Sequence, residues 1–301
     1  MKPSTLSFIR ESRRTPGHSF LDGMHGYVYG RWPYLYIGIG RGLHPLNHIF
    51  GPLLRWLACL LFPDLRSKHA VAEGYHGKVM LPKEAVQMIT INEDVRITVL
   101  EKVIPYSRAR DIILQNPDHL VALECPCRVS QPNPCLPLDV CLVVGEPFAS
   151  FIIEHHPLRS RRITREEGID ILLAEHARGH VHHAFFKDAM LNRFYAICNC
   201  CNCCCGAIQA HENGTPMIAS SGYVCRVDAA LCLGCESCVE SCQFGALSLV
   251  DGVAVVNEGA CMGCSVCTSK CLQEALSLVR EPSKGEPLEI HKIIAGTSRM
   301  S

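Results

Sequence analysis

Two stretches in the last third of the chain carry cysteines at the same spacing, Cys-x2-Cys-x2-Cys-x3-Cys. Three thiolates at two-residue intervals let one tight loop surround a cubane of iron and sulfide and ligate three of its irons. Backbone N–H groups of such a loop can then point at the cluster sulfides. We therefore expect iron–sulfur chemistry here. The first stretch contains Cys232, Cys235, Cys238 and Cys242, and the second contains Cys261, Cys264, Cys267 and Cys271.

The fourth cysteine of each stretch is expected to begin a short helix that leads away, and therefore to ligate the cluster of the other stretch. Gly234 and Gly263 lie inside the loops, where a β-carbon would crowd the cluster. Zinc bound by paired cysteines is the alternative, but such sites usually separate the two pairs by a longer spacer. We therefore expect two [4Fe-4S] clusters, one held by Cys232, Cys235, Cys238 and Cys271 and the other by Cys261, Cys264, Cys267 and Cys242.

The doubled spacing resembles the bacterial two-cluster ferredoxin family over residues 221–281. The resemblance implies a ferredoxin-like βαββαβ module with pseudo-twofold repeats at 222–251 and 252–281. It also implies clusters near enough for electron tunnelling. The family usually has proline after the fourth cysteine, where this chain has Gln243 and Leu272. That proline shapes the turn, so its replacement could shift a cluster potential but removes no ligand.

Ten further cysteines form two groups before this module. Six of them occupy eight positions, which core packing does not explain, and adjacent cysteines make poor disulfides. We expect both groups to bind metal, as a further iron–sulfur cluster or zinc, either separately or facing each other around one larger site. A redox-active dithiol and inert thiols are the alternatives. The first group is Cys125, Cys127, Cys135 and Cys141, and the second is Cys198, Cys200, Cys201, Cys203, Cys204 and Cys205.

The whole layout resembles larger 4Fe-4S-binding proteins of anaerobes, in which Cys-x-Cys-Arg and Cys-Asn-Cys-Cys segments precede a two-cluster ferredoxin module. The match rests on residues 125–128, on a helix at 166–177 followed by Val181-His182, and on residues 198–205. This resemblance implies a redox family and no particular reaction.

Several other residues are candidates for a role. His180, His182 and His183 could be ligands or proton relays, although solvated or structural histidines are favoured. We expect Cys225 to pack at the edge of the module and Cys59 to lie in the core. A nucleotide-binding loop is not legible in the sequence.

The patterning predicts an α+β chain with four parts. Residues 1–76 are expected to be irregular apart from an apolar helix at 49–62, and residues 77–220 to form a cysteine-rich α+β domain. The module at 221–281 follows, and residues 282–301 are expected to be a flexible tail. Within 77–220 we expect helices at 84–91, from Ser107 to about 115 and from Thr164 to Gly179, and strands at 95–103, 120–123 and 195–198.

Composition narrows the setting. The 301 residues have a formal net charge of zero, which gives no reason to expect a nucleic acid partner. Arg13-Arg14 is not followed by an apolar stretch, so we expect no secretion signal and a cytoplasmic protein of a reducing, anaerobic cell. The segment 49–62 is too short to cross a bilayer, but it could dock on a membrane surface or a partner.

We therefore expect an electron-transfer protein that exchanges electrons with a separate oxidoreductase subunit, rather than a stand-alone enzyme. The alternative is an iron–sulfur reductase, whose active site lies at the upstream cysteine groups and is fed by the ferredoxin module. A regulatory sensor of metal or redox state is a third reading.

Overall fold

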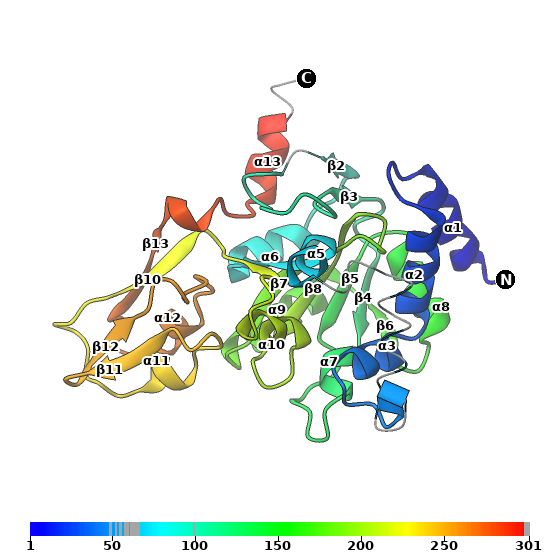
Figure 1. Ribbon diagram of the computed structural model, residues 1–301. Helices are drawn as coiled ribbons and strands as arrows, with labels where there is room; N and C mark the ends of the chain where they lie inside the picture. Colours follow the sequence, from blue (N-terminus) through cyan, green and yellow to red (C-terminus); the bar gives the residue numbers. More distant parts are fainter. Residues whose placement is uncertain are drawn as a thin grey trace.

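The computed structural model describes residues 1–47, 50, 51, 53, 56, 60, 67–98 and 100–297. Figure 1 shows a larger part built on one sheet and a smaller part, coloured yellow to orange, beside it. The chain has a mixed α+β architecture, as predicted. The apolar helix predicted over 49–62, with Cys59, falls mostly outside the described residues. Among those described, the structure contains no helix with the length and apolar character needed to cross a bilayer.

A seven-stranded sheet organises the larger part. All neighbouring strands run antiparallel except β1 and β9, which are parallel. Every residue of β4, β5 and β7 is buried, so both faces of the sheet centre are covered. The strand order is β6 (Ser160–Ile163), β4 (Leu120–Leu123), β5 (Cys141–Val144), β8 (Arg193–Cys200), β7 (Val181–Lys187), β1 (Tyr75–Met80) and β9 (Ile218–Ala219).

Helices pack on this sheet in two sets. The first set has α6 and α9 in mutual contact and against β7, and the second has α1, α2 and α8 packed together. The predicted capping box of Thr164 and Glu167 begins α9, and Gly179, with φ +92°, follows its end as predicted. The helices of the two sets are α6 (Pro82–Ile89), α9 (Arg165–Ala177), α1 (Pro3–Arg14), α2 (Phe20–Arg31) and α8 (Phe148–His155).

The prediction that residues 1–76 are irregular apart from a helix at 49–62 was wrong, because four further helices lie in their described part. Glycines within α2 interrupt the apolar periodicity from which a helix is predicted. A β-carbon at Gly26 would collide with the carbonyl of Ala189, so glycine is what lets this helix approach the β7–β8 turn. A capping box of Ser19 and Asp22 begins the helix. The other three helices are α1, α3 (Pro33–Gly40) and α5 (Lys68–Gly74).

The prediction for residues 95–115 was also wrong in part. The strand expected over 95–103 is only β2 (Val95–Ile97), and the helix expected from Ser107 is replaced by β3 (Ile112–Leu114), which pairs with β2. The Ser107 hydroxyl donates to Glu73 Oε2 at 2.6 Å instead of capping a helix. Ala109 has φ +51°, a left-handed conformation that a helix excludes.

The tail is ordered over its described residues, 282–297, contrary to the flexible tail predicted. It contains a 3-10 turn, η2 (Pro282–Lys284), and α13 (Ile290–Thr297). Leu288 and Ile290 are fully buried, and Lys78 Nζ donates to the carbonyl of Glu286 at 2.7 Å. Lys78 belongs to β1, and α13 itself contacts α6 and β2, so the tail is held against the larger part.

The smaller part repeats one pattern twice. Strand β10 pairs with β13 and β11 pairs with β12, both antiparallel. Left-handed residues recur at matching places in the two halves, at Gly234 and Gly263 and again at Glu236 and Ser265. The elements are β10 (Tyr223–Val227), α11 (Ser237–Glu240), β11 (Leu247–Val250), β12 (Val253–Val256), α12 (Val266–Lys270) and β13 (Leu276–Arg280).

The two loop glycines are also constrained by backbone. A β-carbon at Gly234 would collide with the carbonyl oxygen of Gly252, and one at Gly263 with that of Tyr223. These protein contacts require glycine even before any crowding of a bound cluster is considered.

The variants Gly263→Ala and Gly245→Ala separate these effects. Gly245 also has positive φ, +58°, but a β-carbon there meets nothing within 4 Å. Left-handed backbone costs a non-glycine residue about 1–2 kcal/mol, so we expect Gly245→Ala to lose about that much stability. Gly263→Ala should lose clearly more, as measured by anaerobic thermal unfolding. Equal losses would contradict the steric role of Gly263.

Candidate metal centres

Four thiols line the first cavity of the smaller part, which measures about 170 Å³. Two come from the loop that leads into α11, one lies in α11 itself, and the fourth follows α12. The backbone N–H of Ala254 donates to Cys232 Sγ at 3.4 Å. Cys235 is exposed, so the cavity reaches the surface. The four are Cys232, Cys235, Cys238 and Cys271.

A second, smaller cavity of about 20 Å³ is lined by the matching four thiols and by Cys225. Cys225 is buried, as predicted, with its Sγ 3.7 Å from that of Cys267. N–H groups again point at sulfur, from Ala246 to Cys242 Sγ at 3.3 Å and from Cys225 to Cys261 Sγ at 3.5 Å. The matching four are Cys242, Cys261, Cys264 and Cys267.

The donor sets of both cavities fit an iron–sulfur cluster. Each set combines three cysteines of one stretch with the fourth of the other. Soft thiolates with N–H groups directed at sulfur are what such clusters require. The structure thus brings together the residues that the spacing paired, and their role as ligands stays a prediction.

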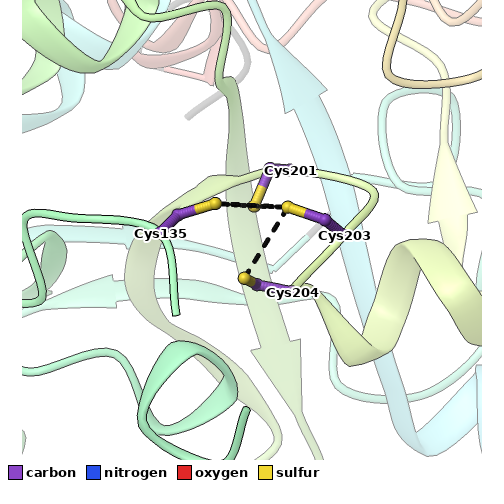
Figure 2. A group of neighbouring side chains, drawn as sticks. All are labelled: Cys135, Cys201, Cys203 and Cys204. Atoms are coloured by element: carbon purple, nitrogen blue, oxygen red, sulfur yellow. Dashed lines mark hydrogen bonds between the residues drawn. The ribbon is translucent and has the colours of Figure 1, made fainter. Parts of the chain in front are cut away.

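The larger part holds a different arrangement, which we call the outer group: Cys135, Cys201, Cys203 and Cys204 (Figure 2). All four sulfurs lie within 4.8 Å of one another, and the closest pair, Cys135 and Cys203, is 3.2 Å apart. A tetrahedral ion with metal–sulfur bonds of about 2.3 Å sets its ligands about 3.8 Å apart. The outer group therefore fits a single ion better than a cubane, whose four irons spread the thiolates farther.

The other six upstream thiols line a buried cavity of about 80 Å³, which we call the inner chamber. Cys141 begins β5, Cys198 and Cys200 end the neighbouring strand β8, and the other three lie in the segments that follow β4 and β8. Cys141 Sγ lies 3.7 Å from Cys198 Sγ. Tyr29 and Tyr195 also line the chamber, with hydroxyl oxygens 2.8 Å apart. The six are Cys125, Cys127, Cys141, Cys198, Cys200 and Cys205, and two thiols of the outer group, Cys201 and Cys204, also line the cavity.

Five of the six inner thiols have raised pKa values, whereas a hydrogen bond with Cys200 lowers the pKa of Cys205. A hydrogen bond with Cys125 and then burial raise the pKa of Cys127 well above its usual range. A hydrogen bond with Cys205 and burial do the same to the pKa of Cys200. A metal that enters the chamber must therefore displace protons.

Arg128, the arginine of the Cys-Pro-Cys-Arg segment, links the two cysteine segments through hydrogen bonds. Its guanidinium is buried and donates to Glu175 Oε2 at 2.5 Å, to the carbonyl of Asn199 at 3.1 Å and to that of Pro137 at 2.5 Å. Although burial raises the pKa of Glu175, the hydrogen bond with His180 and the charge of Arg128 hold it below its ordinary value. The sequence marked Arg128 as part of a motif but gave no signal for this role.

The three histidines are buried, so the solvated reading was wrong and the structural one fits two of them. His180 Nδ1 lies 2.6 Å from Glu175 Oε2, and His182 Nδ1 lies 2.6 Å from Asn199 Oδ1. Both ring nitrogens of His183 lack a hydrogen-bond partner among the described residues. Burial lowers the pKa of His183 to about 3, so its ring is neutral beside Phe244.

One hydrogen bond links the smaller part to the loop of the outer group. The N–H of Asn202, between Cys201 and Cys203, donates to Gln243 Oε1 at 2.9 Å. Gln243 directly follows Cys242 and occupies the position where proline is usual in two-cluster ferredoxins. Nearby, Lys270 Nζ donates to the carbonyl of Ala177 at 2.5 Å.

A family model, the 4Fe-4S binding domain, matches residues 226–248. These residues contain all four cysteines of the first stretch, from Cys232 to Cys242. The chain is therefore an iron–sulfur protein with a domain for at least one [4Fe-4S] cluster. Comparisons with curated proteins and with solved structures find no match.

Replacing Arg128 should destabilise the larger part. Arg128→Met leaves the buried Glu175 carboxylate without its main cation, and breaking a buried pair costs about 3–5 kcal/mol. Arg178→Ala is the control, because Arg178 donates to the same carboxylate from an exposed position and should cost no more than about 1 kcal/mol. Chemical denaturation of both variants measures the difference. Similar losses would show that Arg128 does not anchor the cysteine segments.

Proposed function

We propose that this chain is an electron-transfer protein whose smaller part is a two-cluster ferredoxin module. The observation that carries the proposal is the pair of cavities, each lined by four cysteines drawn from both stretches. The two clusters would exchange single electrons, with burial and N–H···S hydrogen bonds setting their potentials. Helices α11 and α12, which carry Cys238 and Cys267 from the two sets, contact each other, which supports a short distance between the clusters.

The two clusters would exchange electrons with different partners, one outside the chain and one in its larger part. The first cavity opens toward solvent beside Leu233 and Leu272, which are 72% and 94% exposed. Exposed apolar side chains next to a cluster suit the docking of a redox protein, such as an oxidoreductase subunit. The second cavity is lined by Phe244, which lies against His183 of the sheet. Electrons would thus pass between a partner at the first cluster and the larger part at the second.

The hydrogen bond from Asn202 to Gln243 favours the second candidate function, an iron–sulfur reductase. It joins the residue after Cys242 to the loop that carries Cys201 and Cys203. The module would then feed electrons to a metal centre at the upstream cysteines. A reducing compartment, such as the cytoplasm of an anaerobe, would keep these thiols available for metal.

Serine variants test which cysteines share a cluster. In anaerobically purified protein, Cys271→Ser should alter the EPR signal of the same reduced cluster as Cys235→Ser. Cys242→Ser should alter the signal that Cys264→Ser alters. Cys225→Ser is the control, because it lines the second cavity but is not an expected ligand, and both signals should remain. If Cys271→Ser instead follows Cys264→Ser, the proposed exchange of ligands is wrong.

The route into the larger part is tested at Gln243. Gln243→Leu removes an acceptor worth about 1 kcal/mol, and we expect slower reduction of the upstream metal centre once the module is reduced, followed by rapid-freeze EPR. Leu272→Ala is the control, because Leu272 holds the matching position in the other half and is exposed. Unchanged rates in Gln243→Leu, or no electron transfer in the unaltered protein, would contradict the reductase function and leave the carrier function standing.

A further inference from the structure

The ten upstream cysteines divide into two neighbouring sets in the structure, a division that the sequence did not reveal. Only the sulfurs of the outer group gather within 4.8 Å of one another, and two of that group, Cys201 and Cys204, also line the chamber. The outer group is compact enough for one ion, and its four sulfurs account for the coordination of that ion. This leaves six thiols around the inner chamber with no role yet assigned.

We propose that the inner chamber holds a metal centre of its own, an iron–sulfur cluster distinct from the single ion of the outer group. The inference goes beyond electron transfer by the module, because it concerns residues of the larger part alone.

The contacts among the six thiols support one shared site. Cys125 interacts with Cys127 and Cys141, and Cys141 interacts in turn with Cys198. Cys200 interacts with Cys205, whose charge also acts on Cys127. The strongest thiol partners of each of these residues are therefore other members of the same set. The outer thiols likewise lie close to one another, with all four sulfurs within 4.8 Å.

The number of thiols and the space suit a cluster better than an ion. A single tetrahedral ion would use four of the six and leave two buried thiols beside it. The chamber volume, about 80 Å³, lies between those of the two module cavities, about 170 and 20 Å³. The chamber therefore leaves unfilled space among the thiols, as the module cavities do.

Ordinary packing does not account for the chamber. Buried cysteine usually acts as a small apolar side chain that fills space, whereas these six surround a cavity. The Cys141–Cys198 separation of 3.7 Å is far from the disulfide bond length of about 2.05 Å. The remaining wall is largely apolar, with Val143, Phe148 and Ile152, and would exclude water from a bound cluster.

Two arginines lie close enough to offset the negative charge of thiolates. Arg128 lines the chamber, and its charge acts on Cys125. Arg41 donates to the carbonyl of Cys127 at 3.0 Å, and its charge acts on Cys205. The chamber thus combines soft ligands, an apolar wall and nearby positive charge, the conditions that favour an anionic iron–sulfur cluster.

The test compares two double variants of the full chain, reconstituted anaerobically with iron and sulfide. Cys141→Ser/Cys198→Ser removes an inner pair, and Cys135→Ser/Cys203→Ser removes an outer pair as the matched control. We expect the inner variant to lose about four irons with a similar number of sulfides per chain. The outer variant should lose about one metal ion and no sulfide. Unchanged sulfide in the inner variant, or equal losses in both variants, would overturn the proposal.

If the inner variant does not fold, the sulfide content of the unaltered chain and of a module variant still tests the proposal. A module of two [4Fe-4S] clusters supplies about eight sulfides, so the unaltered chain should contain clearly more than this. The module variant Cys232→Ser/Cys261→Ser should keep the inner sulfide and its Mössbauer signal. A chain with no more than about eight sulfides, all lost in the module variant, would overturn the inner cluster alone. If the sulfide content is unchanged in the module variant and falls only in the inner variant, the inner cluster is supported. The same result would contradict the proposal that the module holds two clusters.

Discussion

The buried ion pair between Arg128 and Glu175 is the interaction on which the larger part depends. Arg128 follows directly after Cys127, and its guanidinium also holds the carbonyl of Asn199, which lies between Cys198 and Cys200. Helix α9 supplies the carboxylate, so one charge pair ties two cysteine segments and a helix together. Because a buried guanidinium without its carboxylate is costly, the positions of the thiols follow from this pairing.

The smaller part also brings its thiols together, but through the conformation of its loops. Its two loops are shaped by left-handed residues and by close backbone contacts, without a buried ion pair among its described residues. Gly234 and Gly263 let each loop lie directly on a neighbouring carbonyl. In both parts the thiols converge because a feature outside the cysteines fixes the backbone, an anchored arginine in one and a glycine in the other.

The sequence predicted what depends on local spacing and missed what depends on distant contacts. The capping box of Thr164, the strand at 120–123 and the three-cysteine loop of each module stretch all follow from short-range patterns. The helix predicted from Ser107 failed because Glu73, far away in the chain, accepts from its hydroxyl. The split of the ten upstream cysteines into two sets depends on strand order, which no spacing encodes.

Each module cavity takes thiols from both stretches, so the order of synthesis decides which cavity first has all of its thiols. The most C-terminal thiol of the first cavity is Cys271. That of the second cavity is Cys267, four residues earlier in the chain. A growing chain therefore exposes every thiol of the second site before the first is complete. Each half of the repeat supplies three thiols to one cavity and one to the other, so a chain interrupted between the halves would leave the ribosome with four module thiols divided between two incomplete sites.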